Sequence, residues 1–196
     1  MTEPATTADL PAIRALLGEA YADDPLSVWI FADARTRKDA CAAWFALFAE
    51  QYVSGAQATV VRESDEIVAV ALWRLPEDPP LSSGGTPSIA GLLAALVGAE
   101  RAGEVGAGLH AIGALRVSEP HTYLNFLAVA ADRRRRGLGR LVLEPLFIES
   151  ARKGLPVVLE TTNPANHAFY EALGFAETGR VGVGADGPLV RALRLA

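Results

Sequence analysis

Residues 121–175 decide the fold of this chain, and they begin with an apolar run that predicts a buried strand, Tyr123-Leu124-Asn125-Phe126-Leu127-Ala128-Val129. A basic turn with two glycines follows, Arg133-Arg134-Arg135-Arg136-Gly137-Leu138-Gly139-Arg140, and then an apolar helical pattern. A strand that enters a helix through such a turn forms an anion site, because free backbone N–H groups and the positive end of the helix dipole face one way. The four arginines indicate a ligand with several phosphates.

The second part of this stretch adds polar side chains after a second strand. The strand and the short helix after it are predicted over Pro156–Thr162 and Pro164–Leu173. Tyr170 lies four residues after Asn166 and seven after Asn163, so the three side chains can share one helical face or its N-terminal approach. They are candidates to line one groove.

Together these motifs resemble the signature of the GNAT acetyltransferase superfamily. The matching segments are Arg134-Arg135-Arg136-Gly137-Leu138-Gly139 and Asn166 to Tyr170 with Gly174-Phe175. Within the superfamily the chain is most similar to the puromycin N-acetyltransferases, through Leu159-Glu160-Thr161, Pro145 and the segment Ala20 to Pro25. The resemblance is strong over residues 121–176, moderate over 8–75 and weak over 76–120. Arg135 departs from the family pattern, since a glycine is common there.

The resemblance implies an α/β (α+β) fold with a central, mostly antiparallel sheet that splays where a cofactor inserts, flanked by helices. It implies one N-acetyltransferase domain over residues 1–196. The expected activity is acetyl transfer from acetyl-CoA to a primary amine of a small molecule, by direct attack in a ternary complex. Because no cysteine or serine nucleophile motif is present, no covalent acyl-enzyme is expected.

The residues expected to contact acetyl-CoA come from the first strand, the basic turn and the segment that follows the second strand. They are Leu127, Ala128, Val129, Arg134, Arg135, Arg136, Gly137, Leu138, Gly139, Arg140, Asn163, Asn166 and Tyr170. A splayed strand would leave backbone groups of Leu127 and Val129 free to pair with the pantetheine arm or to stabilise an oxyanion. Two alternatives stay open: a fully paired ordinary strand, and a helix-capping role for Asn163.

Tyr170 and Glu160 are the candidate catalytic residues. In the family a tyrosine at the position of Tyr170 protonates the departing thiolate, and a phenol with a pKa of about 10 carries its proton at neutral pH. A packing role before Gly174-Phe175 is the alternative. The general base is open among Glu160, Asp23, Asp24 and His121, and Glu160 could equally be a structural hydrogen-bond acceptor.

Composition places the chain among globular, non-membrane proteins of one domain. It has 196 residues, of which 51% are hydrophobic and 21% charged. No run approaches the roughly 18 apolar residues of a membrane span, and no secretion is expected, because the first residues lack the basic and apolar regions of a signal peptide. The single Cys41 is expected to pack in the core, which fits a reducing, cytoplasmic location.

The charge balance argues against nucleic acid as a partner. The net charge is −5 and the isoelectric point about 5.2, so the arginine island is interpreted as a local phosphate clamp. With three scattered histidines and one cysteine, no metal site is expected. A non-catalytic CoA-binding regulatory module and a nucleic-acid-binding protein are the alternative functions. The amine acceptor and the oligomeric state, including a homodimer, are left open.

Periodicity predicts the remaining elements. Helices are expected over Thr7–Glu19, Ser27–Phe31, Arg35–Val53 and Gly137–Lys153, with two more inside residues 88–116. Strands are expected over residues 57–63, 66–74, Tyr123–Ala130, Phe175–Val183 and Leu189–Leu195, and a loop over Pro76–Pro87.

Overall fold

One seven-stranded sheet organises the computed structural model, which describes residues 1–78 and 88–196. The strands are β1 (Thr2–Pro4), β2 (Ala58–Glu63), β3 (Glu66–Arg74), β4 (Thr122–Val129), β5 (Val157–Thr161), β6 (Ala176–Gly182) and β7 (Leu189–Leu195). Their order across the sheet is β1-β2-β3-β4-β5-β7-β6. The predicted mixed α/β fold with a central sheet is therefore confirmed.

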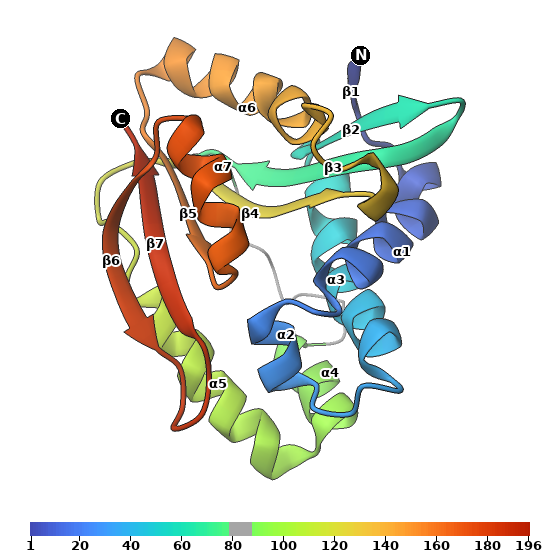
Figure 1. Ribbon diagram of the computed structural model, residues 1–196, viewed down its shortest axis with the longest axis vertical. Coiled ribbons are helices and arrows are strands. Elements are labelled where there is room, and N and C mark those ends of the chain that lie inside the picture. Colours follow the sequence, from blue (N-terminus) through green and yellow to red (C-terminus); the bar gives the residue numbers. More distant parts are fainter. Residues whose placement is uncertain (79–87) are drawn as a thin grey trace.

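The sheet divides between β4 and β5. These two strands are parallel, and they pair only where Thr122 lies opposite Val157 and Tyr123 opposite Val158. All other neighbouring strands are antiparallel. Figure 1 shows the result: β2, β3 and β4 run across the view, while β5, β7 and β6 run nearly upright. The predicted splay is present, and it lies beyond Tyr123.

Seven α-helices flank the described parts of the sheet. They are α1 (Leu10–Tyr21), α2 (Pro25–Ile30), α3 (Arg37–Ser54), α4 (Ile89–Val97), α5 (Ala99–Gly113), α6 (Leu138–Lys153) and α7 (His167–Ala172). Helices α1 and α3 pack against β3 on one face, whereas α6 contacts β2, β3 and β4 from the other (Figure 1). The predicted helices are confirmed to within a few residues. Before α7, a 3₁₀ turn covers Pro164–Asn166.

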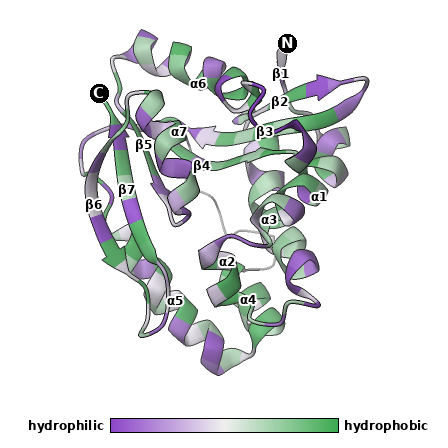
Figure 2. Ribbon diagram, viewed as in Figure 1, coloured by the Kyte–Doolittle hydropathy of each residue, from purple (hydrophilic) through white to green (hydrophobic). Residues whose placement is uncertain are grey.

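Strand β3 is the centre of the core because both of its faces are covered. Val70 and Leu72 point into the cluster formed with α1 and α3, while Ala69 and Ala71 point into the cluster formed with α6. All four are completely buried. Burial on both faces explains why the sequence is apolar without alternation here. In Figure 2, α4 is likewise almost entirely hydrophobic, and Leu93 is its buried member.

Two details of the N-terminal half complete the comparison with the sequence. Ser64 and Asp65 both have positive φ angles, 48° and 68°, as a two-residue hairpin turn requires, so the predicted hairpin is confirmed. Strand β1 was not predicted, and it pairs with β2. The loop expected over Pro76–Pro87 lies outside the described residues from position 79 onward. None of the helices in the described ranges combines the length and apolar character that a bilayer crossing requires.

Candidate active site

A cavity of about 990 Å³ occupies the splay between β4 and β5. Its volume lies within the usual range for ligand pockets. Most residues predicted to contact acetyl-CoA line it: Leu127, Ala128, Val129, Arg134, Arg135, Gly137, Leu138, Gly139, Asn163, Asn166 and Tyr170. Arg136 and Arg140 do not line it. The structure therefore brings together, in one cavity, groups that lie up to about 40 residues apart in the sequence.

The turn into α6 has the backbone geometry of an anion site. Gly137 adopts a left-handed φ of 81° directly before the helix begins at Leu138. Arg135 also has a positive φ of 60°, which accounts for the glycine that is common at this position in the family. The first amides of α6 have no acceptor one turn back within the helix, so they are available to a ligand.

Gly139 has a packing role that the sequence did not predict. We expected it to let the backbone approach a phosphate closely. A Cβ atom at this position would lie 3.1 Å from the ring of Phe169. Gly139 therefore allows α6 and α7 to pack closely beside the cavity, whereas Gly137 has open space around it.

The four consecutive arginines do not act as one group. Arg133 is paired with two carboxylates, Glu63 at 3.0 Å and Asp132. Arg134 donates to the Val129 carbonyl at 3.3 Å and is exposed at the cavity, as is Arg135. Arg133 does not line the cavity and is paired with acids, so of the four arginines only Arg134 and Arg135 face the cavity.

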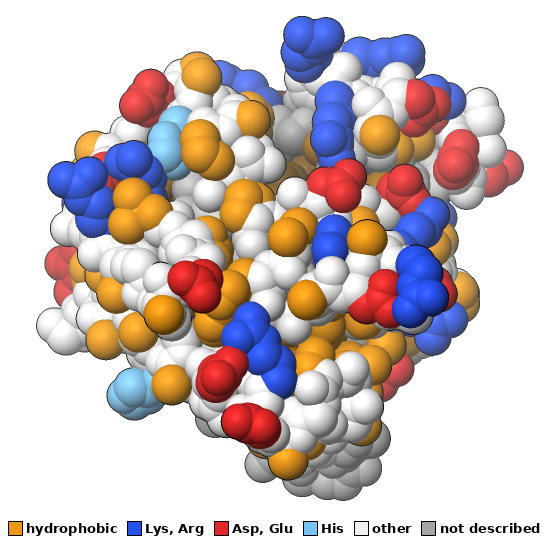
Figure 3. Space-filling model, turned by 60° about the horizontal axis from the view of Figure 1, so that its bottom comes forward, with side chains coloured by type: hydrophobic (Ala, Val, Ile, Leu, Met, Phe, Trp, Pro, Cys, Tyr) orange, Lys and Arg blue, Asp and Glu red, His pale blue; other side chains and the backbone are white. Residues whose placement is uncertain are grey.

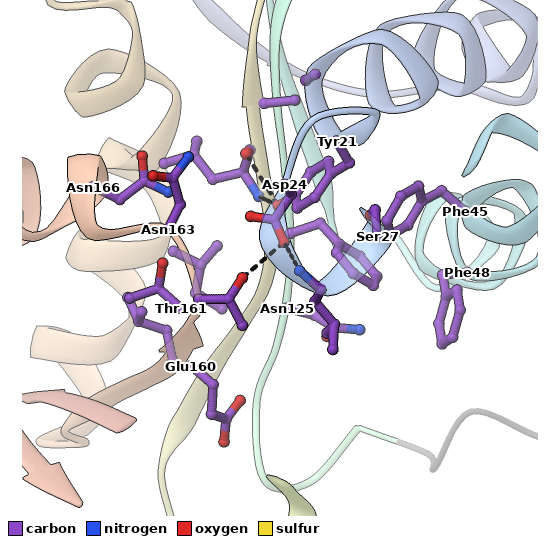
Figure 4. A pocket seen from close by; sticks show the side chains of 18 of the residues that line it. Tyr21, Asp24, Ser27, Phe45, Phe48, Asn125, Glu160, Thr161, Asn163 and Asn166 are labelled. Carbon is purple, nitrogen blue, oxygen red and sulfur yellow. Dashed lines mark hydrogen bonds between the residues drawn. The ribbon is translucent and has the colours of Figure 1, made fainter. Parts of the chain in front are cut away.

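The open edge of β4 is occupied by a tyrosine hydroxyl. The Tyr21 hydroxyl accepts from the Leu127 N–H and donates to the Leu127 carbonyl, with both distances 3.2 Å (Figure 4). The sequence left open whether these backbone groups are free for the pantetheine arm or paired, and in the structure the groups of Leu127 are paired with Tyr21. Tyr21 itself comes from the end of α1 and lines the cavity. No sequence pattern links residues 106 positions apart, so this contact was not predicted.

Tyr170 lies on α7 with its ring held by Phe169 and Phe175, at centroid distances of 5.1 Å and 5.6 Å. The residue is buried but lines the cavity. Burial raises the pKa of its phenol above the ordinary value, and the nearby charge of Asp24 raises it further. The group therefore carries its proton at neutral pH, as a proton donor must.

Asp24 is the acidic residue of the cavity whose charge acts on both Tyr170 and Tyr21, where it raises the pKa of each phenol. Its carboxylate caps α2 by accepting from the Leu26 N–H at 2.9 Å, and it accepts from the Thr162 hydroxyl at 2.7 Å (Figure 4). Burial raises its pKa, although these hydrogen bonds act in the opposite direction. A partly desolvated carboxylate of this kind is suited to receive a proton.

Glu160 occupies a separate polar network. It accepts from the Tyr123 hydroxyl at 2.5 Å, and Arg116 approaches its other oxygen at 3.8 Å. Burial raises the pKa of Glu160, while Tyr123 and Arg116 lower it. The other two candidate bases do not line the cavity: Asp23 is exposed, and His121 contacts the Glu119 carbonyl. Of the four candidate bases, Asp24 and Glu160 are the two that line the cavity.

The two asparagines stand at the start of the segment that leads to α7. The Asn163 side chain accepts from the Ala165 N–H at 3.0 Å, which is the capping role left open by the sequence. Both Asn163 and Asn166 line the cavity (Figure 4). Capping uses the carbonyl oxygen of Asn163, so this bond does not use its amide N–H groups.

An aromatic wall faces these polar groups across the cavity. Phe45 and Phe48 of α3 contact Phe126 of β4, with ring centroids 4.9 Å and 5.3 Å apart. Figure 4 shows Phe45 and Phe48 on the side opposite Asn163 and Asn166. The helical period of α3 predicted an apolar face, but a core face and a cavity wall have the same period, so the sequence could not separate them.

The surface charges, the possible metal ligands and the single cysteine also bear on the expectations from the sequence. On the face shown in Figure 3, basic side chains gather along the upper margin, and elsewhere acidic and basic groups are interspersed. In the described ranges, no three His, Cys, Asp or Glu side chains lie together as metal ligands would. Cys41 is a buried free thiol, as its sequence context predicted.

The geometry agrees with comparisons to known proteins. A profile of the acetyltransferase (GNAT) family matches residues 12–175. The chain belongs to this family. A solved structure described as histone acetyltransferase HPA2 and related acetyltransferase, from Corynebacterium glutamicum, is 28% identical, with a TM-score of 0.68 over 99% of this chain and 94% of that one.

Two further structures share the fold at lower identity. A polyamine N-acetyltransferase of Drosophila melanogaster is 15% identical, with a TM-score of 0.70 over 100% of this chain and 98% of that one. A mosquito arylalkylamine N-acetyltransferase is 14% identical, with a TM-score of 0.63 over the same shares. These likenesses show a GNAT fold that is found among amine acetyltransferases.

Proposed function

We propose that this protein is an acetyl-CoA-dependent N-acetyltransferase that acetylates a primary amine of a small molecule by direct attack in a ternary complex. The observation that carries the proposal is the single cavity in the splay. It joins the N-terminal turn of α6 to a buried carboxylate, Asp24, and a buried phenol, Tyr170. We propose that residues 1–196 work as one domain.

The residues at the α6 end fit the phosphates of acetyl-CoA. The amides that follow Gly137, together with Arg134 and Arg135, would hold the pyrophosphate. Arg136 and Arg140 would act from the rim, because they are exposed outside the cavity lining. Leu127, Ala128 and Val129 would lie beside the pantetheine arm with Asn163 and Asn166. When bound, acetyl-CoA supplies the thioester as acetyl donor.

Two residues of this chain supply the proton transfers. Asp24 takes a proton from the acceptor ammonium or from the attacking amine, and Tyr170 donates a proton to the departing thiolate. Glu160 is the second candidate for the base, but the Tyr123 hydroxyl and Arg116 already engage both of its oxygens. This arrangement favours Asp24 over Glu160 for the proton transfer.

The main alternative is a CoA-binding regulatory module without turnover. Placing Asp24 and Tyr170 within one cavity costs desolvation of both groups, which a binding module would not need. A puromycin-like aminonucleoside remains one acceptor to test, and a cytoplasmic location is proposed from the single free Cys41.

A thiol-release assay with acetyl-CoA tests the proposal. The acceptor panel should contain arylalkylamines, aminonucleosides, polyamines and peptide N-termini. Release of CoA that depends on an amine supports the transferase. Binding of acetyl-CoA by calorimetry without release on any acceptor would support the regulatory module instead.

Paired arginine variants test the cofactor site separately. Replacing both Arg134 and Arg135 with Gln should weaken acetyl-CoA binding at least tenfold and reduce its salt dependence, because two phosphate contacts are lost. Arg133→Gln is the matched control, since Arg133 is already paired with Glu63. Equal weakening by the control would place the phosphates elsewhere.

A further inference from the structure

The far end of the cavity from the α6 turn contains a buried hydroxyl group without a partner. Tyr52 of α3 is completely buried, and its hydroxyl oxygen has no hydrogen-bond partner among the described residues. Burial raises the pKa of Tyr52 and a polar contact with Asn125 lowers it, but this contact does not meet hydrogen-bond geometry. Both residues line the cavity. Because a buried unsatisfied hydroxyl is costly, it points to a ligand atom that completes the site.

Two arginines line the same end of the cavity. Arg116 donates to the Tyr123 hydroxyl at 3.2 Å and lies 3.8 Å from Glu160. Arg74 extends over the Tyr123 ring, with its guanidinium carbon 5.9 Å from the centroid. No carboxylate in residues 1–78 or 88–196 pairs with Arg74, and residues 79–87 include no Asp or Glu. Glu160 is paired with Arg116, whereas Arg74 has no such pair, although the charge of Asp78 also reaches this end of the cavity at Tyr52.

The aromatic wall lies between this cationic end and the position proposed for acetyl transfer. Phe126 stands on β4 between Leu127 and Tyr123, and Phe48 packs against it from α3. An acceptor that crosses this region must therefore present an apolar, preferably aromatic, body.

Strand β4 sets the length of the acceptor. Tyr123 lies four positions before Leu127, which is beside the proposed transfer position, and four steps along an extended strand span about 13 Å. Arg74 lies opposite Tyr123 in the β3–β4 register, and its side chain extends into the cavity and shortens this span. The amine and the group bound by Arg74 must lie on opposite ends of the acceptor.

We propose that the acceptor is a primary amine on an aromatic body that carries a carboxylate at its far end, and that Tyr52, Arg74 and Arg116 bind this carboxylate. The inference rests on the proposed N-acetyltransferase function and narrows its substrate class. Two charge-assisted hydrogen bonds from arginine and one from the tyrosine hydroxyl match the acceptor atoms of a carboxylate. A second cation, as in a diamine, would meet the guanidinium of Arg74, which forms no salt bridge within residues 1–78 and 88–196.

Three acceptors of equal shape test the proposal. They are 4-(2-aminoethyl)benzoic acid, its neutral carboxamide, and the analogue with an aminomethyl group in place of the carboxylate. We expect kcat/KM, measured by thiol release, to be at least tenfold higher for the acid than for the amide, and lowest for the diamine. Equal values for all three, or a preference for the diamine, would overturn the carboxylate site and leave the transferase function intact. Absence of release with every amine would count against the proposed function itself.

Variants locate the site. Arg74→Gln and Tyr52→Phe should each reduce the acid-to-amide ratio of kcat/KM severalfold toward one. Arg14→Gln is the matched control, because it removes the same charge from an exposed position on α1 and should leave the ratio unchanged. A binding measurement without catalysis gives a second readout: 3-phenylpropionate should raise the melting temperature of the wild type more than that of Arg74→Gln. An unchanged ratio in both cavity variants would show that these residues do not bind the carboxylate.

Discussion

The Tyr21 hydroxyl bonds both the N–H and the carbonyl of Leu127, at 3.2 Å each. This pairing satisfies the edge of β4 where β5 has turned away, and a ligand that pairs with β4 at this point must displace it. Tyr21 therefore occupies the backbone groups of β4 with which a ligand would pair; we call this its placeholder role.

Replacing Tyr21 with Phe tests this relationship. We expect the free energy of unfolding to fall by about 1–3 kcal/mol, because two backbone groups of Leu127 lose their partner. Acetyl-CoA should then stabilise the variant more than it stabilises the wild type, since no hydroxyl must be displaced. Tyr52→Phe is the control for loss of a buried hydroxyl, because that hydroxyl has no partner to lose. Chemical denaturation with and without acetyl-CoA measures both effects, and equal stabilisation in Tyr21→Phe and wild type would contradict the placeholder role.

Gly137 and Gly154 provide a matched pair at the two ends of α6. Both have positive φ, 81° and 65°, and neither has an atom within 4 Å of a built Cβ. Replacing either with Val should cost stability of about 1–2 kcal/mol or more through backbone strain. Only Gly137→Val should also weaken acetyl-CoA binding, by tenfold or more, because it distorts the amide turn. Calorimetry that finds equal affinity in both folded variants would remove the turn from the phosphate site.

Asp24→Asn separates proton transfer from helix capping, since Asn also caps helices well. Burial raises the folded-state pKa of Asp24 above its ordinary value of 3.8, so its favourable contribution is present below that value and is lost as pH rises through the folded-state pKa. The neutral variant should therefore gain stability relative to wild type across that rise. Turnover should fall about a hundredfold, and the acidic limb of the kcat/KM profile should disappear.

Glu160→Gln is the comparison for this measurement, and we expect it to lower turnover less than tenfold. If instead Glu160→Gln removes the acidic limb and Asp24→Asn keeps it, then Glu160 is the base.

Tyr170→Phe keeps the packing against Phe169 and Phe175 but removes the phenolic proton. We expect turnover to fall about a hundredfold or more, with acetyl-CoA affinity nearly unchanged, because the loss occurs only as the thiolate departs. Initial rates across pH with an acceptor from the panel measure it. Full turnover in the variant would show that Tyr170 only packs and that another group protonates the sulfur.

The sequence predicted the parts of the fold that depend on local patterns. The β2–β3 hairpin, the turn before α6 and the two helices within residues 88–116 all follow from periodicity and turn chemistry. Strand β1 was missed, because three residues ending in Pro4 carry no readable period and form a strand only by pairing with β2. Long-range pairing of this kind leaves no local trace.

The candidate site also has one part that local sequence patterns predicted and one part that they did not. The motif near Gly137 identified the cofactor end, whereas the acceptor end required the structure. Arg133 reads like its neighbours, yet Glu63, 70 residues earlier, binds it. Tyr52 belongs to a helix and Arg74 to a strand end, and only the packing of α3 against the β3–β4 part of the sheet places them at one cavity.

The short join between β4 and β5 has a mechanical consequence. Backbone pairing across it involves only Thr122 and Tyr123 on β4, so the two parts of the sheet are hinged together at one end. A molecule that fills the cavity touches both parts and works as a brace against opening of this hinge. Occupancy and rigidity of the sheet should therefore rise together, and slower amide hydrogen exchange in β5 on addition of acetyl-CoA would report the bracing.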